Sequence, residues 1–189
     1  MTRKLIIKST SVIQNQKVFL NGNLVFENPA AEDFSVFAKS YYQHLEIQYP
    51  KFYKMDRLSK LGFLAFETLL KGVADFEKYD KEKLGVFLMN RHSSLDTDEQ
   101  YYETFLDKNT PPSPKLFVYT LPNIVIGEIC IRHKIKGEHG FFVGEQYDED
   151  FINDYVQSLF QDDLIEACAV GWTDFYKEEY LAKMKWLSP

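Results

Sequence analysis

Residues 140–160 read GFFVGEQYDEDFINDYVQSLF, and this stretch sets the fold class of the chain. The apolar run from Gly140 to Val143 predicts a strand, and Gly144-Glu145-Gln146 predicts a tight turn after it. In α/β enzymes such a turn often holds a nucleophile, because the helix N-terminus that follows stabilises negative charge. Gln146 occupies this position, and its amide has no ionisable nucleophilic atom. The predicted helix over 148–160 has apolar residues at helical spacing: Phe151, Ile152, Tyr155, Val156, Leu159 and Phe160.

Strand and helix patterns alternate along the rest of the chain. Leu84 to Met89 is a short apolar run between charged and polar flanks, which predicts a central parallel strand. Asp56 is the expected N-cap of a helix that is apolar nearly all round and therefore buried on more than one side. Residues 124–131 fit either a helix or a strand. Further strands are expected at 5–13, 17–20, 24–26 and 165–172, and further helices at 32–48 and 98–106.

This alternation predicts an α/β fold with a mainly parallel or mixed central sheet flanked by helices. A chain of 189 residues that is 45% hydrophobic has enough apolar material for one well-buried domain, so we expect a single domain over residues 1–189. Between Trp172 and Leu187 the aromatic and apolar residues recur near helical spacing. We interpret that segment as an amphipathic helix that packs on the domain or anchors an interface.

Composition excludes several classes of function. The net charge is -6 and no basic cluster stands out, so we expect no nucleic-acid partner. The apolar runs are too short to cross a bilayer, and the first eight residues contain no apolar segment of signal-peptide length, which predicts a cytoplasmic location. Cys130 and Cys168 each lie in an apolar segment, which favours buried thiols over a disulfide.

A few polar residues are candidates for chemistry. Asp96, Asp98 and Glu99 are close in sequence, but we expect Asp96 or Thr97 to cap a helix, and we expect no metal and no cofactor. His92 follows the predicted strand at Leu84 to Met89, where α/β sites usually form, but we favour a surface loop over a site at this position. His139 could pair with a neighbouring glutamate, but nothing in the sequence specifies this.

Several segments together resemble the N-terminal half of a β-ketoacyl-acyl-carrier-protein synthase, a member of the thiolase-like superfamily. Residues 49–62 (YPKFYKMDRLSKLG) are similar to the opening of that family's first long helix. Residues 85–98 (GVFLMNRHSSLDTD) resemble the strand and loop that follow, and residues 112–123 (PSPKLFVYTLPN) resemble a later stretch. Gly137 stands nine residues before Gln146, as a glycine does before the family's nucleophile. The resemblance implies a thiolase-like N-terminal half.

The resemblance also implies that no catalytic set is intact. The family has a nucleophilic cysteine where this chain has Gln146, and neither Cys130 nor Cys168 is placed to replace it. All four histidines precede Gln146, so none matches the two that the family's second half supplies for decarboxylation. Chain-length-factor subunits of polyketide synthases carry glutamine at the same position, and Gly144-Glu145-Gln146 resembles them.

We therefore interpret the chain as a protein without catalytic activity, a ketosynthase-like accessory subunit in fatty-acid or polyketide (polyene-type) biosynthesis. The alternative is a residual acyl-thioester enzyme, either a malonyl decarboxylase or a 3-oxoacyl-carrier-protein synthase component that works with a partner chain. The resemblance implies a homodimer or heterodimer through the strand at 140–143, with an acyl carrier protein, a complete ketosynthase or both as partners. It suggests binding roles for Phe117, Asn123, Phe142, Gln146 and His92.

Overall fold

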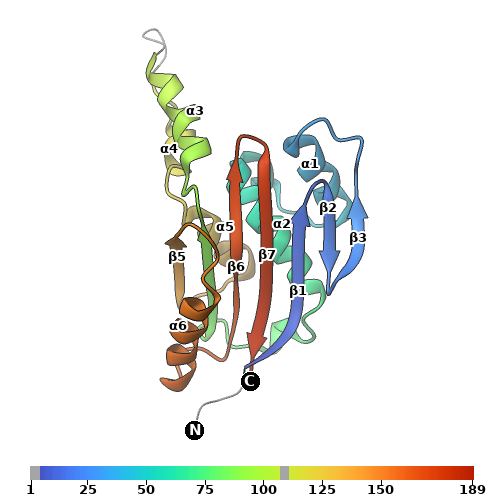
Figure 1. Ribbon diagram of the computed structural model, residues 1–189, viewed down its shortest axis with the longest axis vertical. Coiled ribbons are helices and arrows are strands. Elements are labelled where there is room, and N and C mark those ends of the chain that lie inside the picture. Colours follow the sequence, from blue (N-terminus) through green and yellow to red (C-terminus); the bar gives the residue numbers. More distant parts are fainter. Residues whose placement is uncertain (1–4, 107–110) are drawn as a thin grey trace.

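A computed structural model describes residues 5–106 and 111–189. Seven strands form one mixed sheet in the order β3-β2-β1-β7-β6-β4-β5 (Figure 1). The mixed α/β fold is confirmed, but parallel pairing is limited to β4 with β5 and β4 with β6. All other neighbours are antiparallel. The strands are β1 (Ile6–Gln14), β2 (Lys17–Leu20), β3 (Asn23–Glu27), β4 (Leu84–Asn90), β5 (His139–Val143), β6 (Ala167–Tyr176) and β7 (Glu179–Ser188).

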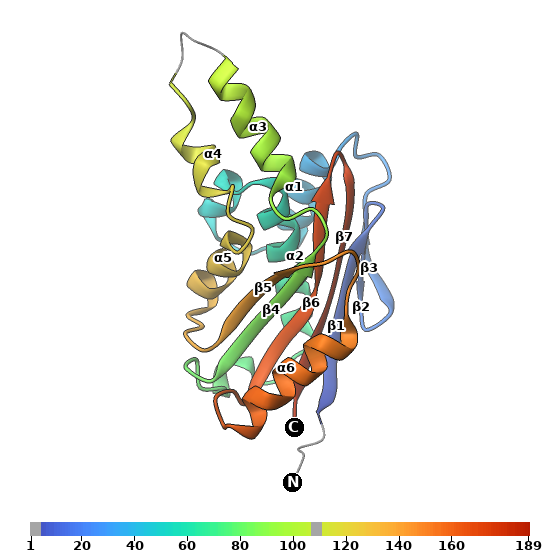
Figure 2. The same cartoon turned by 60° about the vertical axis from the view of Figure 1, so that its left-hand side comes forward.

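Helices cover the two faces of the sheet unequally. α1, α2 and α5 lie on one face, whereas α6 crosses part of the other face near β4, β5 and β6 (Figure 2). α3 and α4 project beyond the end of the sheet as an arm (Figures 1 and 2). The helices are α1 (Phe34–His44), α2 (Arg57–Lys71), α3 (Leu95–Leu106), α4 (Pro114–Val118), α5 (Ile124–His133) and α6 (Glu149–Gln161), with short 3-10 helices η1 (Pro50–Lys54) and η2 (Phe76–Lys78).

α2 is the central helix of the larger core. Its predicted N-cap is confirmed, because the Asp56 carboxylate accepts a 2.9 Å hydrogen bond from the backbone N–H of Ser59. The hydroxyls of Ser9 and Ser11 on β1 donate 2.8 Å hydrogen bonds to the α2 carbonyls of Leu69 and Ala65. Two buried polar side chains are thereby satisfied, and the helix is fixed against the strand.

β4 is the central strand of the parallel part of the sheet, as predicted. All seven of its residues are buried, because β5 and β6 flank it and helices cover both of its faces. Val86 and Leu88 enter the core under α2 and α5, whereas Phe87 and Met89 enter a second core under α6. The ambiguous stretch at 124–131 is helical and forms most of α5.

The helix predicted between Trp172 and Leu187 is wrong. Trp172 lies in β6, and β7 forms an antiparallel hairpin with β6 through Lys177 and Glu178, which both have positive φ. Along β7 every second residue enters the main core, namely Ala182, Met184 and Trp186. The buried residues of this segment therefore recur with the period of two that is typical of a strand. The near-helical spacing of its aromatic residues does not reflect a helix.

The bounds of α1 and α3 also differ from the prediction. α1 spans Phe34–His44 rather than 32–48. α3 begins at Leu95 rather than at residue 98, so Asp96 and Thr97 lie inside its first turn and do not cap it. The Asp96 carboxylate instead accepts hydrogen bonds from Gln100 and Arg57.

Candidate functional site

The turn between β5 and α6 holds Gln146 as predicted, but it does not place that side chain at the helix N-terminus. Gln146 is exposed, and Tyr147 and Asp148 separate it from the first residue of α6. The Asp148 carboxylate caps the helix by accepting a 2.9 Å hydrogen bond from the backbone N–H of Phe151. Glu149 and Asp150 add negative charge in the first turn. An anion at Gln146 would therefore face carboxylates instead of a free helix end.

Neither cysteine can act as a nucleophile beside Gln146. Cys168 is fully buried in β6, and burial raises the pKa of its thiol strongly. Burial raises the pKa of Cys130 on α5 to about 11. Both thiols therefore stay protonated near neutral pH, and neither lines the cleft beside Gln146.

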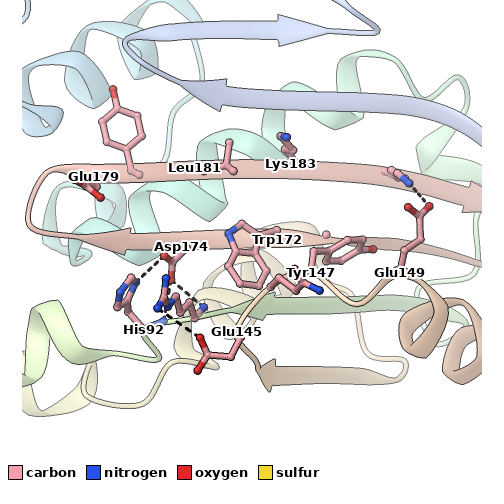
Figure 3. Close-up of a pocket in the computed structure, with 14 residues that line it drawn as sticks. His92, Glu145, Tyr147, Glu149, Trp172, Asp174, Glu179, Leu181 and Lys183 are labelled. Atoms are coloured by element: carbon pink, nitrogen blue, oxygen red, sulfur yellow. Dashed lines mark hydrogen bonds and ion pairs between the residues drawn. The ribbon is translucent and has the colours of Figure 1, made fainter.

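An open cleft of about 710 Å³ lies between the β5–α6 turn and the exposed face of the β6–β7 hairpin (Figure 3). The core under α6 contains residues of β4 and β6 but only Leu187 from β7, so the part of β7 nearer its hairpin turn is left open. The lining combines charged, aromatic and amide side chains from four segments: Arg91, His92, Glu145, Gln146, Tyr147, Glu149, Gly171, Trp172, Asp174, Glu179, Tyr180, Leu181, Lys183 and Lys185.

His92 and Asp174 form the best-defined polar pair in the cleft. His92 Nδ1 lies 2.7 Å from Asp174 Oδ2, and the two side chains meet at one end of the cleft (Figure 3). Asp174 Oδ1 accepts hydrogen bonds from the backbone N–H groups of Arg91 and His92, at 3.1 and 3.0 Å. Tyr176 stacks on the imidazole with ring centroids 4.9 Å apart. These contacts fix both the carboxylate and the ring.

The loop after β4 is shaped to present His92. The Asn90 side chain bonds to both the backbone N–H and the carbonyl of Ser93, and Ser93 has a φ of 52°. The backbone N–H of Gly144, after β5, donates a 2.9 Å hydrogen bond to the Asn90 carbonyl. A backbone hydrogen bond therefore connects the tight turn after β4 to the turn that holds Gln146.

Ion pairs and one phenol complete the lining. Arg91 pairs with Glu145 at 3.5 Å, and Lys185 pairs with Glu149. Burial, with a smaller contribution from Glu149, raises the pKa of Tyr147 to about 12, so this phenol remains a hydrogen-bond donor at neutral pH.

The structure brings two of the five predicted binding residues, His92 and Gln146, into this one cleft. Phe142 lies in β5 and packs edge-on against Phe151, in an adjoining hollow that Gln146 also lines. Phe117 is exposed on α4, and Asn123 precedes α5 without a capping side-chain hydrogen bond. Neither Phe117 nor Asn123 reaches the cleft, so their binding roles remain predictions.

Sequence reasoning missed Asp174 and Trp172. A signal was available, because His92 follows β4 and Asp174 lies two residues beyond the last β6 residue that pairs with β4. The carboxyl ends of neighbouring parallel strands meet at one edge of a sheet, where sites form in α/β folds. The predicted helix at Trp172–Leu187 hid this signal, because it ended the strand at Trp172.

The described ranges, 5–106 and 111–189, contain no group of three or more His, Cys, Asp or Glu side chains that could hold a metal ion. None of their helices is long and apolar enough to cross a lipid bilayer.

Comparison with known proteins identifies the fold. No family model and no curated protein matches the sequence. Among solved structures, the ishigamide ketosynthase/chain length factor superposes with a TM-score of 0.72 at 16% identity, over 98% of this chain and 62% of that one. The chain has the ketosynthase/chain-length-factor fold.

Two other ketosynthase complexes show the same fold. AntDE:AntF, a type II polyketide synthase acyl carrier protein with its ketosynthase bound to the hexaketide, gives a TM-score of 0.72 at 12% identity, over 97% of this chain and 62% of that one. The ketosynthase ApeO in complex with its chain length factor ApeC from Xenorhabdus doucetiae gives a TM-score of 0.62 at 13% identity, over 97% of this chain and 78% of that one. The chain thus spans about three-fifths of the length of the first two ketosynthase-fold chains.

Proposed function

We propose that this chain is a ketosynthase-like accessory subunit that pairs with a complete ketosynthase and does not itself catalyse condensation. The observation that carries the proposal is the β5–α6 turn. In the family that the chain resembles, the nucleophile stands where this chain has Gln146. Asp148 caps the helix that follows, and both cysteines are protonated near neutral pH and lie outside the cleft beside Gln146. The fold supports a relationship to ketosynthases and chain length factors.

β5 is the surface we propose for the partner. Within the described ranges it ends the sheet and pairs with β4 alone, so one row of its backbone N–H and C=O groups faces outward. Its sequence, HGFFV, is mostly apolar, and the Val143 side chain is 57% exposed. Edge strands that are not meant to pair usually carry charge or proline, and β5 carries neither apart from His139 at its start.

The α3–α4 arm extends this surface on the same side of the molecule (Figure 1). It carries large apolar side chains that are exposed in the isolated chain: Tyr102, Phe105, Leu106, Phe117, Val118 and Leu121. Several large apolar side chains exposed on neighbouring elements are typical of a protein–protein interface. We infer that a ketosynthase adds a strand to β5 and covers the arm. An acyl carrier protein would then deliver acyl chains to the pair, in a fatty-acid or polyketide pathway such as polyene synthesis.

The test is affinity purification of the tagged chain from its native cells, with the co-purified proteins identified by mass spectrometry. We expect a ketosynthase in stoichiometric amount, and its loss with Val143→Lys, because a charged side chain blocks strand addition. Val25→Lys on β3, the opposite edge strand, is the matched control and should retain the partner.

Two outcomes contradict the proposal. Recovery of neither a ketosynthase nor an acyl carrier protein would reject the accessory role. If the chain instead forms a homodimer that Val143→Lys dissociates, the proposed surface is correct, but its partner is a second copy of the chain.

A further inference from the structure

The accessory role assigns no function to the His92–Asp174 pair. An ionised carboxylate can only accept hydrogen bonds, so Asp174 Oδ2 holds the imidazole proton on Nδ1. Nε2 then carries the lone pair, and no side chain or backbone group of the described residues bonds to it. The ring is 30% exposed at the cleft, whereas Asp174 is only 15% exposed behind it. A carboxylate that orients a histidine with a free Nε2 is the arrangement of a general base.

The rest of the cleft fits an acyl thioester. Trp172 and Leu181 give an apolar wall for an acyl chain beside His92 (Figure 3). Arg91 and Gln146 carry N–H donors that can approach a carbonyl oxygen as it becomes negative. Lys183 also lines the cleft and has no ion-pair partner in the described part of the chain, so it can bind the phosphate of a carrier arm.

We propose that this cleft hydrolyses acyl thioesters, with His92 as the general base and Asp174 as its positioning residue. The substrate class rests on the proposed function, in which an acyl carrier protein brings acyl chains to the subunit. An activity of this kind would release stalled or wrongly loaded acyl groups from the carrier.

The reaction needs only water. His92 Nε2 takes a proton from water while the water oxygen forms a bond to the thioester carbon, and the carbonyl electron pair moves onto oxygen. When that pair returns, the carbon–sulfur bond breaks, and His92 gives its proton to the departing sulfur. The products are a free acid and a thiol, and the imidazole regains its starting state.

The experiment follows release of free octanoate from octanoyl-N-acetylcysteamine and from an octanoyl carrier protein, by the purified full-length chain. We expect hydrolysis above the buffer rate, and a loss of about 100-fold or more in His92→Gln, the lower end of what a general base contributes. His44→Gln is the matched control, because His44 is exposed at the end of α1, outside the cleft, and the variant should hydrolyse as the wild type does.

Asp174→Asn tests the positioning role with a signal that a purely structural residue would not change. Asparagine can still accept from the backbone N–H groups of Arg91 and His92, but its amide N–H₂ faces Nδ1 and moves the ring proton to Nε2. Nitrogen NMR of the neutral imidazole should show this tautomer change together with lost hydrolysis, in protein whose thermal unfolding is unchanged.

Wild-type protein that is no faster than buffer, or His92→Gln that is as fast as wild type, would overturn the inference. Failure here is separable from failure of the accessory role, because ketosynthase co-purification is measured on the same preparations. His92→Gln should still retain the ketosynthase. If the chain binds the ketosynthase but hydrolyses no thioester, only the proposed hydrolase activity is rejected.

Discussion

Asp148, and not Gln146, interacts with the N-terminus of α6: its Oδ1 accepts a 2.9 Å hydrogen bond from Phe151, while Gln146 lies exposed two residues earlier. Residue 146 therefore does not face the positive end of α6, and this end is what would activate a thiol at that position. A helix N-terminus lowers a thiol pKa only when its positive end faces the sulfur without a competing carboxylate.

Gln146→Cys should therefore create an accessible thiol of ordinary acidity. We expect iodoacetamide to label it with a pH dependence close to that of a free cysteine, whose pKa is about 8.5, and we expect no condensation activity. The measurement is the labelling rate against pH, followed by mass spectrometry. Adding Asp148→Asn, which keeps an oxygen acceptor for the cap but removes its charge, should lower the thiol pKa. A strongly lowered pKa in the single variant would contradict this account of the turn.

The two native thiols should not react in the folded protein. Burial raises the pKa of Cys130 to about 11 and that of Cys168 further, so almost no thiolate is present near neutral pH. A thiol-specific disulfide reagent should modify neither residue in native protein and both after unfolding in urea. Rapid modification of Cys168 without urea would mean that β6 opens locally far more often than its full burial predicts.

Asp56 should make stability depend on pH. Burial raises the pKa of this carboxyl above its usual 3.8, against the opposing hydrogen bonds from Ser59 and Thr97. The unfolded chain therefore loses this proton at lower pH than the folded protein does. The contribution of Asp56 is fully present below about 3.8 and decreases as the pH rises through the raised folded pKa.

Asp56→Asn removes that titration and keeps an acceptor for the cap. Urea unfolding from about pH 4 to about pH 7 should show a smaller decrease in stability with pH than in wild type. Asp33→Asn is the control, because Asp33 caps α1 at the surface by accepting a 2.8 Å bond from Val36. An equal effect of the two substitutions would count against the burial of Asp56 as the cause.

Two glycine-to-alanine substitutions should have opposite effects on the stability of the protein. A Cβ on Gly171 would lie 2.2 Å from the Lys183 carbonyl oxygen, a backbone atom of β7 that cannot move without disturbing the hairpin. We expect Gly171→Ala to destabilise the protein by about 1–3 kcal/mol. A Cβ on Gly127 in α5 would meet nothing within 4 Å, so Gly127→Ala should stabilise by roughly 0.5–1 kcal/mol through helix propensity. Chemical denaturation of both variants checks the pair.

The sequence by itself determined the local elements wherever one pattern prevailed. The apolar run of β4, the Asp56 cap of α2 and the strand–turn–helix around Gln146 all followed from local chemistry, because burial and capping act over a few residues. These patterns predicted an α/β fold, and the resemblance of several segments to the ketosynthase family implied the ketosynthase-type fold.

Tertiary structure decided the rest. Pairing of β7 with β6 and β1 made the C-terminal segment a strand. β6 is its hairpin neighbour, but the β1 residues that complete its ladder lie near the other end of the chain. The cleft is likewise a product of topology: β4 and β6 run parallel side by side, and this brings His92 against Asp174, 82 residues further along the chain. A hydrogen bond between residues so distant in sequence depends on which strands are neighbours, and no local pattern encodes that.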